Sequence, residues 1–103
     1  MTAKTPEIVE VDPRLLRLPS QRRDGADPVK LARQIAKHGK SIDGMPLLKL
    51  TRGKDGHLQI TDGVTRATRI AKLLPGTLIK GEVIDNRPKL DVTREATVGE
   101  KLP

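Results

Sequence analysis

A chain of 103 residues with a formal net charge of +7 and a pI near 10.2 is long enough for one small domain. It contains no Phe, Tyr, Trp or Cys, so its core must be aliphatic, and disulfides, thiolate metal ligands and thiol catalysis are excluded. No apolar run approaches the ~20 residues of a membrane span, and no signal peptide opens the chain. We therefore expect a cytoplasmic protein with no membrane partner, unless it is exported by a route that needs no such signal. The positive charge favours an anionic partner, nucleic acid above all.

The N-terminal residues, 1–6, are small and polar, and we expect them to be disordered. The domain itself should span 7–85. Its first strand is expected at residues 8–11, where an Asp-Pro pair ends it. A short helical turn with leucine anchors follows, and then a polar, basic loop at residues 19–27.

Asp27 and Pro28 predict the start of a helix, because Asp is a favoured N-cap and Pro fits the first helical position. Gly39 follows a basic last turn and predicts the end of this helix. Four apolar residues recur at helical spacing and should face the core: Leu31, Ala32, Ile35 and Ala36. The polar residues between them should face outward: Lys30, Arg33, Gln34 and Lys37.

A strand at 46–50, a glycine-rich turn at 52–56 and a returning strand at 57–61 predict a β-hairpin. An Asp-Gly pair breaks the second of these strands, and a second helix runs from there to a Pro-Gly pair. A last strand is expected at 77–84. The order β-α-β-β-α-β predicts an α+β (α/β) domain with a small mixed sheet and two main helices.

Residues 86–103 contain few apolar side chains. Segments of this kind cannot bury enough surface to offset the entropy of ordering. We therefore expect a flexible tail that becomes ordered when it meets a partner. A short edge strand or helix is the alternative.

The strongest functional signal is the turn at Asp62-Gly63, where a strand enters a helix. The outward face of that helix should carry five polar residues: Thr65, Arg66, Thr68, Arg69 and Lys72. Free N–H groups at a helix N-terminus favour an anion, and Gly63 lets the backbone bend and a ligand approach. Arg66 and Arg69, one turn apart, could grip phosphate oxygens. The alternative is that Asp62 only caps the helix and the arginines form a solvated face.

Three segments carry a family resemblance in the same order along the chain. The first, residues 11–23, reads VDPRLLRLPSQRR and looks like an opening strand with an Asn/Pro-x-Gln-x-Arg segment. The second is DPVKLARQIAKHG, a helix that leads to a Pro-hydrophobic strand. The third is ITDGVTRATRIAKLL, which looks like a strand–Asp/Glu-Gly-x-x-Arg–helix signature. Together they resemble the ParB/sulfiredoxin superfamily over about residues 8–85, as a stand-alone ParB N-terminal-like or ParB-like nuclease domain.

The resemblance implies a phosphate site at Gly63, Thr65 and Arg66, because the Gly-x-x-Arg box of chromosome-partitioning ParB proteins binds the phosphates of CTP. That box usually reads Gly-Glu-Arg-Arg, whereas this chain has Gly-Val-Thr-Arg. In sulfiredoxin the box holds the catalytic cysteine, so the absence of cysteine excludes sulfinic-acid reduction. In the resembled fold Arg22 and Arg23 lie near this turn and could complete one cationic groove with it.

Three functions stay open. The first is a module that binds nucleic acid, DNA foremost, or a nucleotide, through phosphate contacts that depend strongly on salt. The second is a ParB-like nuclease or nucleotide hydrolase in which Asp62 and His57 position water or a metal. The third is a degenerate domain that binds protein. We expect no metal site built by the chain itself, and the only cofactor suggested is Mg²⁺ brought by a nucleotide.

Overall fold

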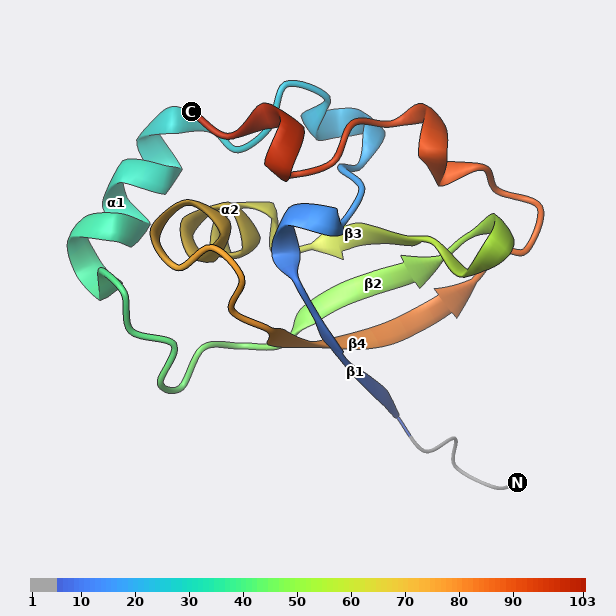
Figure 1. The fold of residues 1–103 in the computed structure, drawn as a ribbon, viewed down its shortest axis with the longest axis horizontal. Coiled ribbons are helices and arrows are strands. Elements are labelled where there is room, and N and C mark those ends of the chain that lie inside the picture. Colours follow the sequence, from blue (N-terminus) through green and yellow to red (C-terminus); the bar gives the residue numbers. More distant parts are fainter. Residues whose placement is uncertain (1–5) are drawn as a thin grey trace.

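A four-stranded mixed sheet and two α-helices form the domain, which is the α+β class predicted from the sequence (Figure 1). The structure is a computed structural model and describes residues 6–103. The strands lie in the order β1-β4-β2-β3, with β4 antiparallel to β1 and parallel to β2, while β2 and β3 form an antiparallel hairpin. Their bounds are Glu7–Val11 for β1, Leu48–Arg52 for β2, Leu58–Asp62 for β3 and Ile79–Asn86 for β4.

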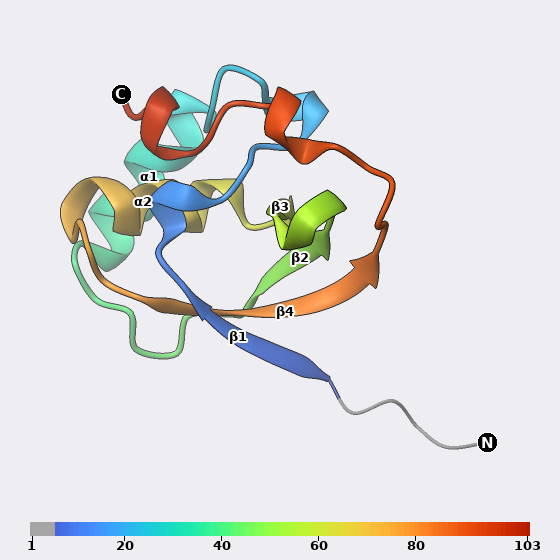
Figure 2. The ribbon, with the colours of Figure 1, turned by 45° about the vertical axis from the view of Figure 1, so that its right-hand side comes forward.

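The helices α1 (Pro28–His38) and α2 (Val64–Leu73) lie on the same side of the sheet (Figures 1 and 2). Helix α2 packs on the sheet, and α1 packs on α2. The apolar side chains of the core are all aliphatic, as the composition requires. Its buried members are Leu16, Leu18, Leu48, Leu50, Ile60, Val64, Ala67, Ile70, Ala71, Ile79 and Val98.

The ends of α1 are those predicted. The Asp27 carboxylate accepts hydrogen bonds from the backbone N–H groups of Val29 (2.8 Å) and Lys30 (3.1 Å), and these bonds lower the pKa of Asp27. The N–H of Gly39 donates to the Ile35 carbonyl at 2.8 Å and closes the helix. The apolar stripe is narrower than predicted. Leu31 is buried, but both alanines of the predicted stripe are exposed, because α1 contacts a single helix rather than the sheet.

Strands β2 and β4 each begin and end two residues later than the sequence suggested. Pro46, which opens the predicted β2, has no N–H to give to the ladder. The residues expected to be disordered, 1–6, lie outside the described part of the chain except for Pro6. No helix within residues 6–103 is long and apolar enough to cross a membrane.

The C-terminal segment, residues 87–103, folds back over the domain instead of leaving it as a tail (Figures 1 and 2). It contains two 3₁₀ turns, and its Val92 and Val98 are each 1% exposed. The N–H of Leu18 donates to the Ala96 carbonyl, and the N–H of Val98 donates to the Leu16 carbonyl, both at 2.9 Å. The structure thus corrects the prediction of a tail, and the segment contains two 3₁₀ turns and one isolated bridge, at Thr97, where a short edge strand or helix was the alternative. The residues on which this segment packs lie some eighty positions earlier in the chain, so no pattern within the segment itself predicts the contact.

Replacing Val98 with Ala tests this packing. Val98→Ala should lower the free energy of unfolding by about 1.5–2.5 kcal/mol, because it removes two buried carbon atoms and leaves a cavity. Val29, which is 60% exposed, provides the matched control. Val29→Ala should change stability by less than about 0.5 kcal/mol. Urea unfolding of the two variants measures the difference, and equal losses would mean that the segment does not pack on the core.

Candidate functional site

The turn between β3 and α2 depends on Gly63. Its φ of 114° and ψ of 22° are unfavourable for any residue with a Cβ atom. A Cβ placed here would also lie 2.5 Å from Cδ2 of Leu48 in the neighbouring strand. Gly63 therefore lets the strand turn directly into the helix while α2 stays in contact with the sheet.

The N-terminus of α2 has no side-chain cap. Gly63 is the N-cap residue and offers no acceptor, whereas α1 is capped by Asp27 through two hydrogen bonds. Asp62 was the capping residue in the alternative interpretation of the sequence, but it forms an ion pair with Arg66 instead. The first N–H groups of α2 therefore lack a side-chain acceptor within residues 6–103, and an anion could satisfy them.

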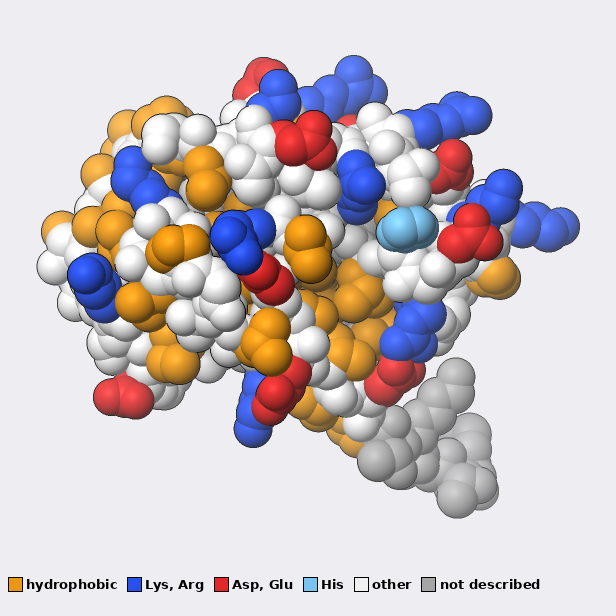
Figure 3. All heavy atoms as spheres, viewed as in Figure 1, with side chains coloured by type: hydrophobic (Ala, Val, Ile, Leu, Met, Phe, Trp, Pro, Cys, Tyr) orange, Lys and Arg blue, Asp and Glu red, His pale blue; other side chains and the backbone are white. Residues whose placement is uncertain are grey.

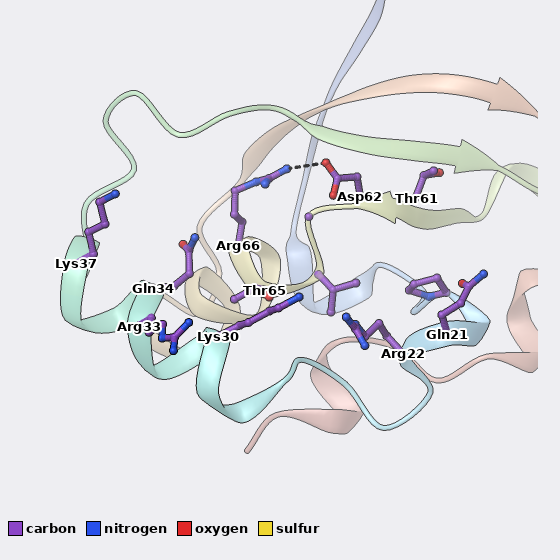
Figure 4. Close-up of a pocket in the computed structure, with 13 residues that line it drawn as sticks. Gln21, Arg22, Lys30, Arg33, Gln34, Lys37, Thr61, Asp62, Thr65 and Arg66 are labelled. Atoms are coloured by element: carbon purple, nitrogen blue, oxygen red, sulfur yellow. Dashed lines mark ion pairs between the residues drawn. The ribbon is translucent and has the colours of Figure 1, made fainter.

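These N–H groups open into a cleft of about 680 Å³. The cleft lies between α1, the N-terminal turn of α2, the end of β3 and the loop that contains the 3₁₀ turn η2 (Ser20–Arg22) (Figure 4). Five basic side chains and a single carboxylate line it, which gives a net formal charge of +4. The charged residues are Arg22, Lys30, Arg33, Lys37, Arg66 and Asp62.

Arg66 is partly ordered at the edge of this cleft. Its Nη2 donates to the Leu47 carbonyl at 3.3 Å and lies 3.6 Å from Oδ2 of Asp62. Asp62 is 72% exposed, so this ion pair adds little to stability. The Nε atom of Arg66 is buried and has no partner among residues 6–103. The side chain is 19% exposed, so an anionic ligand could accept hydrogen bonds from the part of the guanidinium that is not buried.

Arg69 was predicted to face the ligand, and this prediction is wrong. The residue is 1% exposed, and its Nη1 donates to the carbonyls of Gly39 (2.7 Å) and Ser41 (2.8 Å). Burial lowers the pKa of Arg69. A cation suits this place because the C-terminal carbonyls of α1 carry partial negative charge. Arg69 thus links α2 to the residues that follow α1, and its role is structural.

The other predicted site residues divide into two groups. Thr65 and Arg22 line the cleft together with Gly63, Asp62 and Arg66. Arg23 and His57 do not line it and are exposed elsewhere. His57 lies five residues before Asp62, beyond the far end of β3, which is a distance of roughly 16 Å along an extended strand. The structure therefore does not bring the two predicted catalytic residues together.

Helix α1 supplies cleft residues that the sequence interpretation left on a solvated face. They are Lys30, Arg33, Gln34 and Lys37. Their spacing indicated one face of a helix, but nothing local showed that this face borders the turn at Gly63. The contact between α1 and α2 places it there.

The charge in the cleft differs from that on other parts of the surface. On the face drawn in Figure 3, basic and acidic side chains are interspersed. Within residues 6–103, no group of three or more His, Cys, Asp or Glu side chains is placed to hold a metal ion. The basic side chains of the cleft could therefore bind an anion directly.

Comparison of the chain with known protein-family models and with curated proteins finds no match. The ParB/sulfiredoxin resemblance therefore rests on the three segments described above. The geometry of the cleft has to support any function by itself.

The turn can be tested with two glycine variants. Gly63→Ala should lower the free energy of unfolding by about 2–4 kcal/mol, because backbone strain adds to the clash with Leu48. Gly76 is the matched control, since its φ is also positive (87°) but a Cβ there would meet nothing within 4 Å. Gly76→Ala should cost only about 1–2 kcal/mol. Equal costs in urea unfolding would show that the Leu48 contact does not constrain the turn.

Proposed function

We propose that the protein binds a phosphate-bearing ligand, a nucleic acid or a nucleotide, in the basic cleft at the N-terminus of α2. The observation that carries the proposal is that five cations and an uncapped helix N-terminus share one cleft with a single carboxylate. Backbone N–H groups and the helix dipole favour phosphate oxygens at this position. A guanidinium group can donate two parallel hydrogen bonds to the oxygens of one phosphate.

The ParB/sulfiredoxin resemblance is part of this proposal. It is supported by the order of the elements and by the place of the Asp-Gly-x-x-Arg segment. In this segment Asp62 ends β3, Gly63 forms the turn, and Arg66 lies in the first turn of α2. A cytoplasmic location would give the cleft access to both nucleic acids and nucleotides.

The composition constrains how the ligand is held. The chain has no Phe, Tyr or Trp and neither of its histidines lines the cleft, so bases have no aromatic ring to stack on there. Phosphate contacts then supply most of the affinity, so binding should vary little with base sequence and fall steeply with salt. Duplex DNA, which exposes its phosphates and keeps its bases stacked, suits this surface better than a single strand does. A nucleotide would bring Mg²⁺ with it.

Amide chemical shifts provide the direct test. A short DNA duplex, CTP and ATP, each with Mg²⁺ at low and moderate salt, would be added to the full chain. The proposal expects shifts centred on Gly63–Arg66 with at least one of these ligands, and the ligand that gives them separates nucleic-acid binding from nucleotide binding. Absence of shifts there with every ligand would reject the proposal and point to a protein partner.

Two arginines one turn apart form a matched pair for this test. Arg66→Met should weaken binding about tenfold or more, because a hydrogen bond to a charged group is worth roughly 1.5–3 kcal/mol. Arg69→Met removes the same charge but no group that lines the cleft, so it should weaken binding by the folded protein less than Arg66→Met does. It should instead cost about 2–4 kcal/mol of stability, because the Gly39 and Ser41 carbonyls lose their donor. The reverse pattern would contradict the assignment.

A hydrolase remains the second candidate, because the exposed Asp62 carboxylate lies beside the proposed phosphate position. If the cleft hydrolyses its ligand, Asp62→Ala should slow cleavage of labelled DNA or nucleotide about 10²–10⁴-fold while binding is retained. His57→Ala should have no effect, because His57 lies outside the cleft. Cleavage that survives Asp62→Ala would exclude the role given to this carboxylate.

A further inference from the structure

Three cations on α1 form a row along the cleft: Lys30, Arg33 and Lys37. Their spacing of three and four residues places them on one face of the helix, over about 10 Å from first to last. All three are exposed. This row is separate from the turn at Gly63, although both border the same cleft (Figure 4).

No cation of the row forms an ion pair in the described part of the chain, although Asp27, the N-cap of α1, lies near Lys30. Six other basic side chains form ion pairs with carboxylates: Arg14, Arg17, Lys49, Arg52, Arg66 and Arg87. None of the ion pairs within residues 6–103 includes a cation of the row, and α1 contains no Asp or Glu. Like charges at this spacing destabilise a helix slightly. The helix dipole favours Lys37 in the last turn of α1, but it gives no reason for Lys30 or Arg33, whereas a polyanionic partner would account for all three cations.

The length of the row can be compared with the spacing of phosphates in a nucleic acid. One strand of a B-form duplex presents a phosphate about every 3.4 Å along the helix axis. Because the strand winds around this axis, neighbouring phosphates lie farther apart along the backbone than the axial spacing, and a row of about 10 Å spans about two or three of them. A single nucleoside triphosphate held at the α2 N-terminus would leave much of this row unused.

We infer that the cleft binds the phosphodiester backbone of a nucleic acid, which runs along α1 from the anion position at Gly63, and that a free nucleotide is not its ligand. This inference rests on the proposed function and names the ligand class of the same site. The cleft contains no aromatic ring on which a base could stack, so contacts to phosphates supply most of the affinity. DNA and RNA offer the same backbone chemistry, so the experiment has to separate them.

Two triple variants test the inference. The first combines Lys30→Gln, Arg33→Gln and Lys37→Gln. The control combines Lys80→Gln, Lys89→Gln and Arg94→Gln. It also removes two lysines and one arginine, but from exposed positions that do not line the cleft. The affinities of the intact chain and both variants are measured for a DNA duplex, an RNA duplex and ATP–Mg²⁺ over a range of salt concentrations. Thermal unfolding confirms that both variants fold.

The inference expects the α1 variant to lose about 30-fold or more in affinity for a duplex. The slope of log affinity against log salt should fall by about 2–3, because each lost phosphate contact contributes about 0.9. The control variant should lose less than about threefold and keep its slope. The affinity for ATP–Mg²⁺ should be weak in all three proteins and nearly unchanged by the α1 variant. The duplex that binds more tightly to the intact chain identifies the nucleic acid.

Equal losses in the two variants would overturn the inference, and so would ATP–Mg²⁺ binding as tight as duplex binding. Competition by poly-glutamate as strong as that by DNA would also overturn it, because the row would then select negative charge and not a phosphate backbone. In each of these cases, amide shifts at Gly63–Arg66 with a nucleotide would leave the proposed function standing. Duplex-induced shifts on α1 without any at Gly63–Arg66 would reject the proposed function and keep the row as a nucleic-acid contact.

Discussion

The close approach of β2 to the β3–α2 turn is the constraint on which the cleft depends. Leu48 fills the space that a side chain at position 63 would need, and it is itself fully buried in the core. The chain can therefore pass from strand to helix without a capping side chain, and α2 can lie directly on the sheet. The same glycine that permits this packing also leaves the helix N-terminus without an acceptor. Gly63 thus serves both the packing of α2 on the sheet and the proposed ligand binding, so a substitution there would alter both.

Arg69 sets the other side of the cleft. By donating to the carbonyls of Gly39 and Ser41, which follow the end of α1, its guanidinium fixes where that helix ends relative to α2. The row of cations on α1 is then held beside the uncapped turn. A buried cation at a helix C-terminus is a costly way to join two helices, but the packed side chains around it and the two carbonyls offset the desolvation. The cleft is therefore defined by two residues with different tasks, since Gly63 provides a free helix end and Arg69 orients the opposite wall.

Much of the fold could be predicted from local signals. Asp27, Pro28 and Gly39 mark the helix they were expected to mark, and the alternation of strands and helices gives the α+β class. The candidate site was predictable only in part. Gly63, Thr65 and Arg66 follow from a strand–glycine–helix pattern, whereas the orientation of Arg69 depends on where α1 ends in space. The cations of α1 and the burial of Val98 depend equally on contacts between distant segments, which periodicity within one element does not reveal.

The pairing of residues 96–98 with residues 16–18 has a consequence for how the chain folds. Residues 16–18 continue the sheet beyond β3 through backbone bonds to Leu58 and Ile60, and their other side is covered only by the C-terminal segment. During synthesis this edge stays open until residues 96–98 have been made. Contacts of such high sequence separation form late because the loop-closure entropy must be overcome first. Until then the nascent domain presents an unprotected strand edge, which is the kind of surface that pairs with other chains.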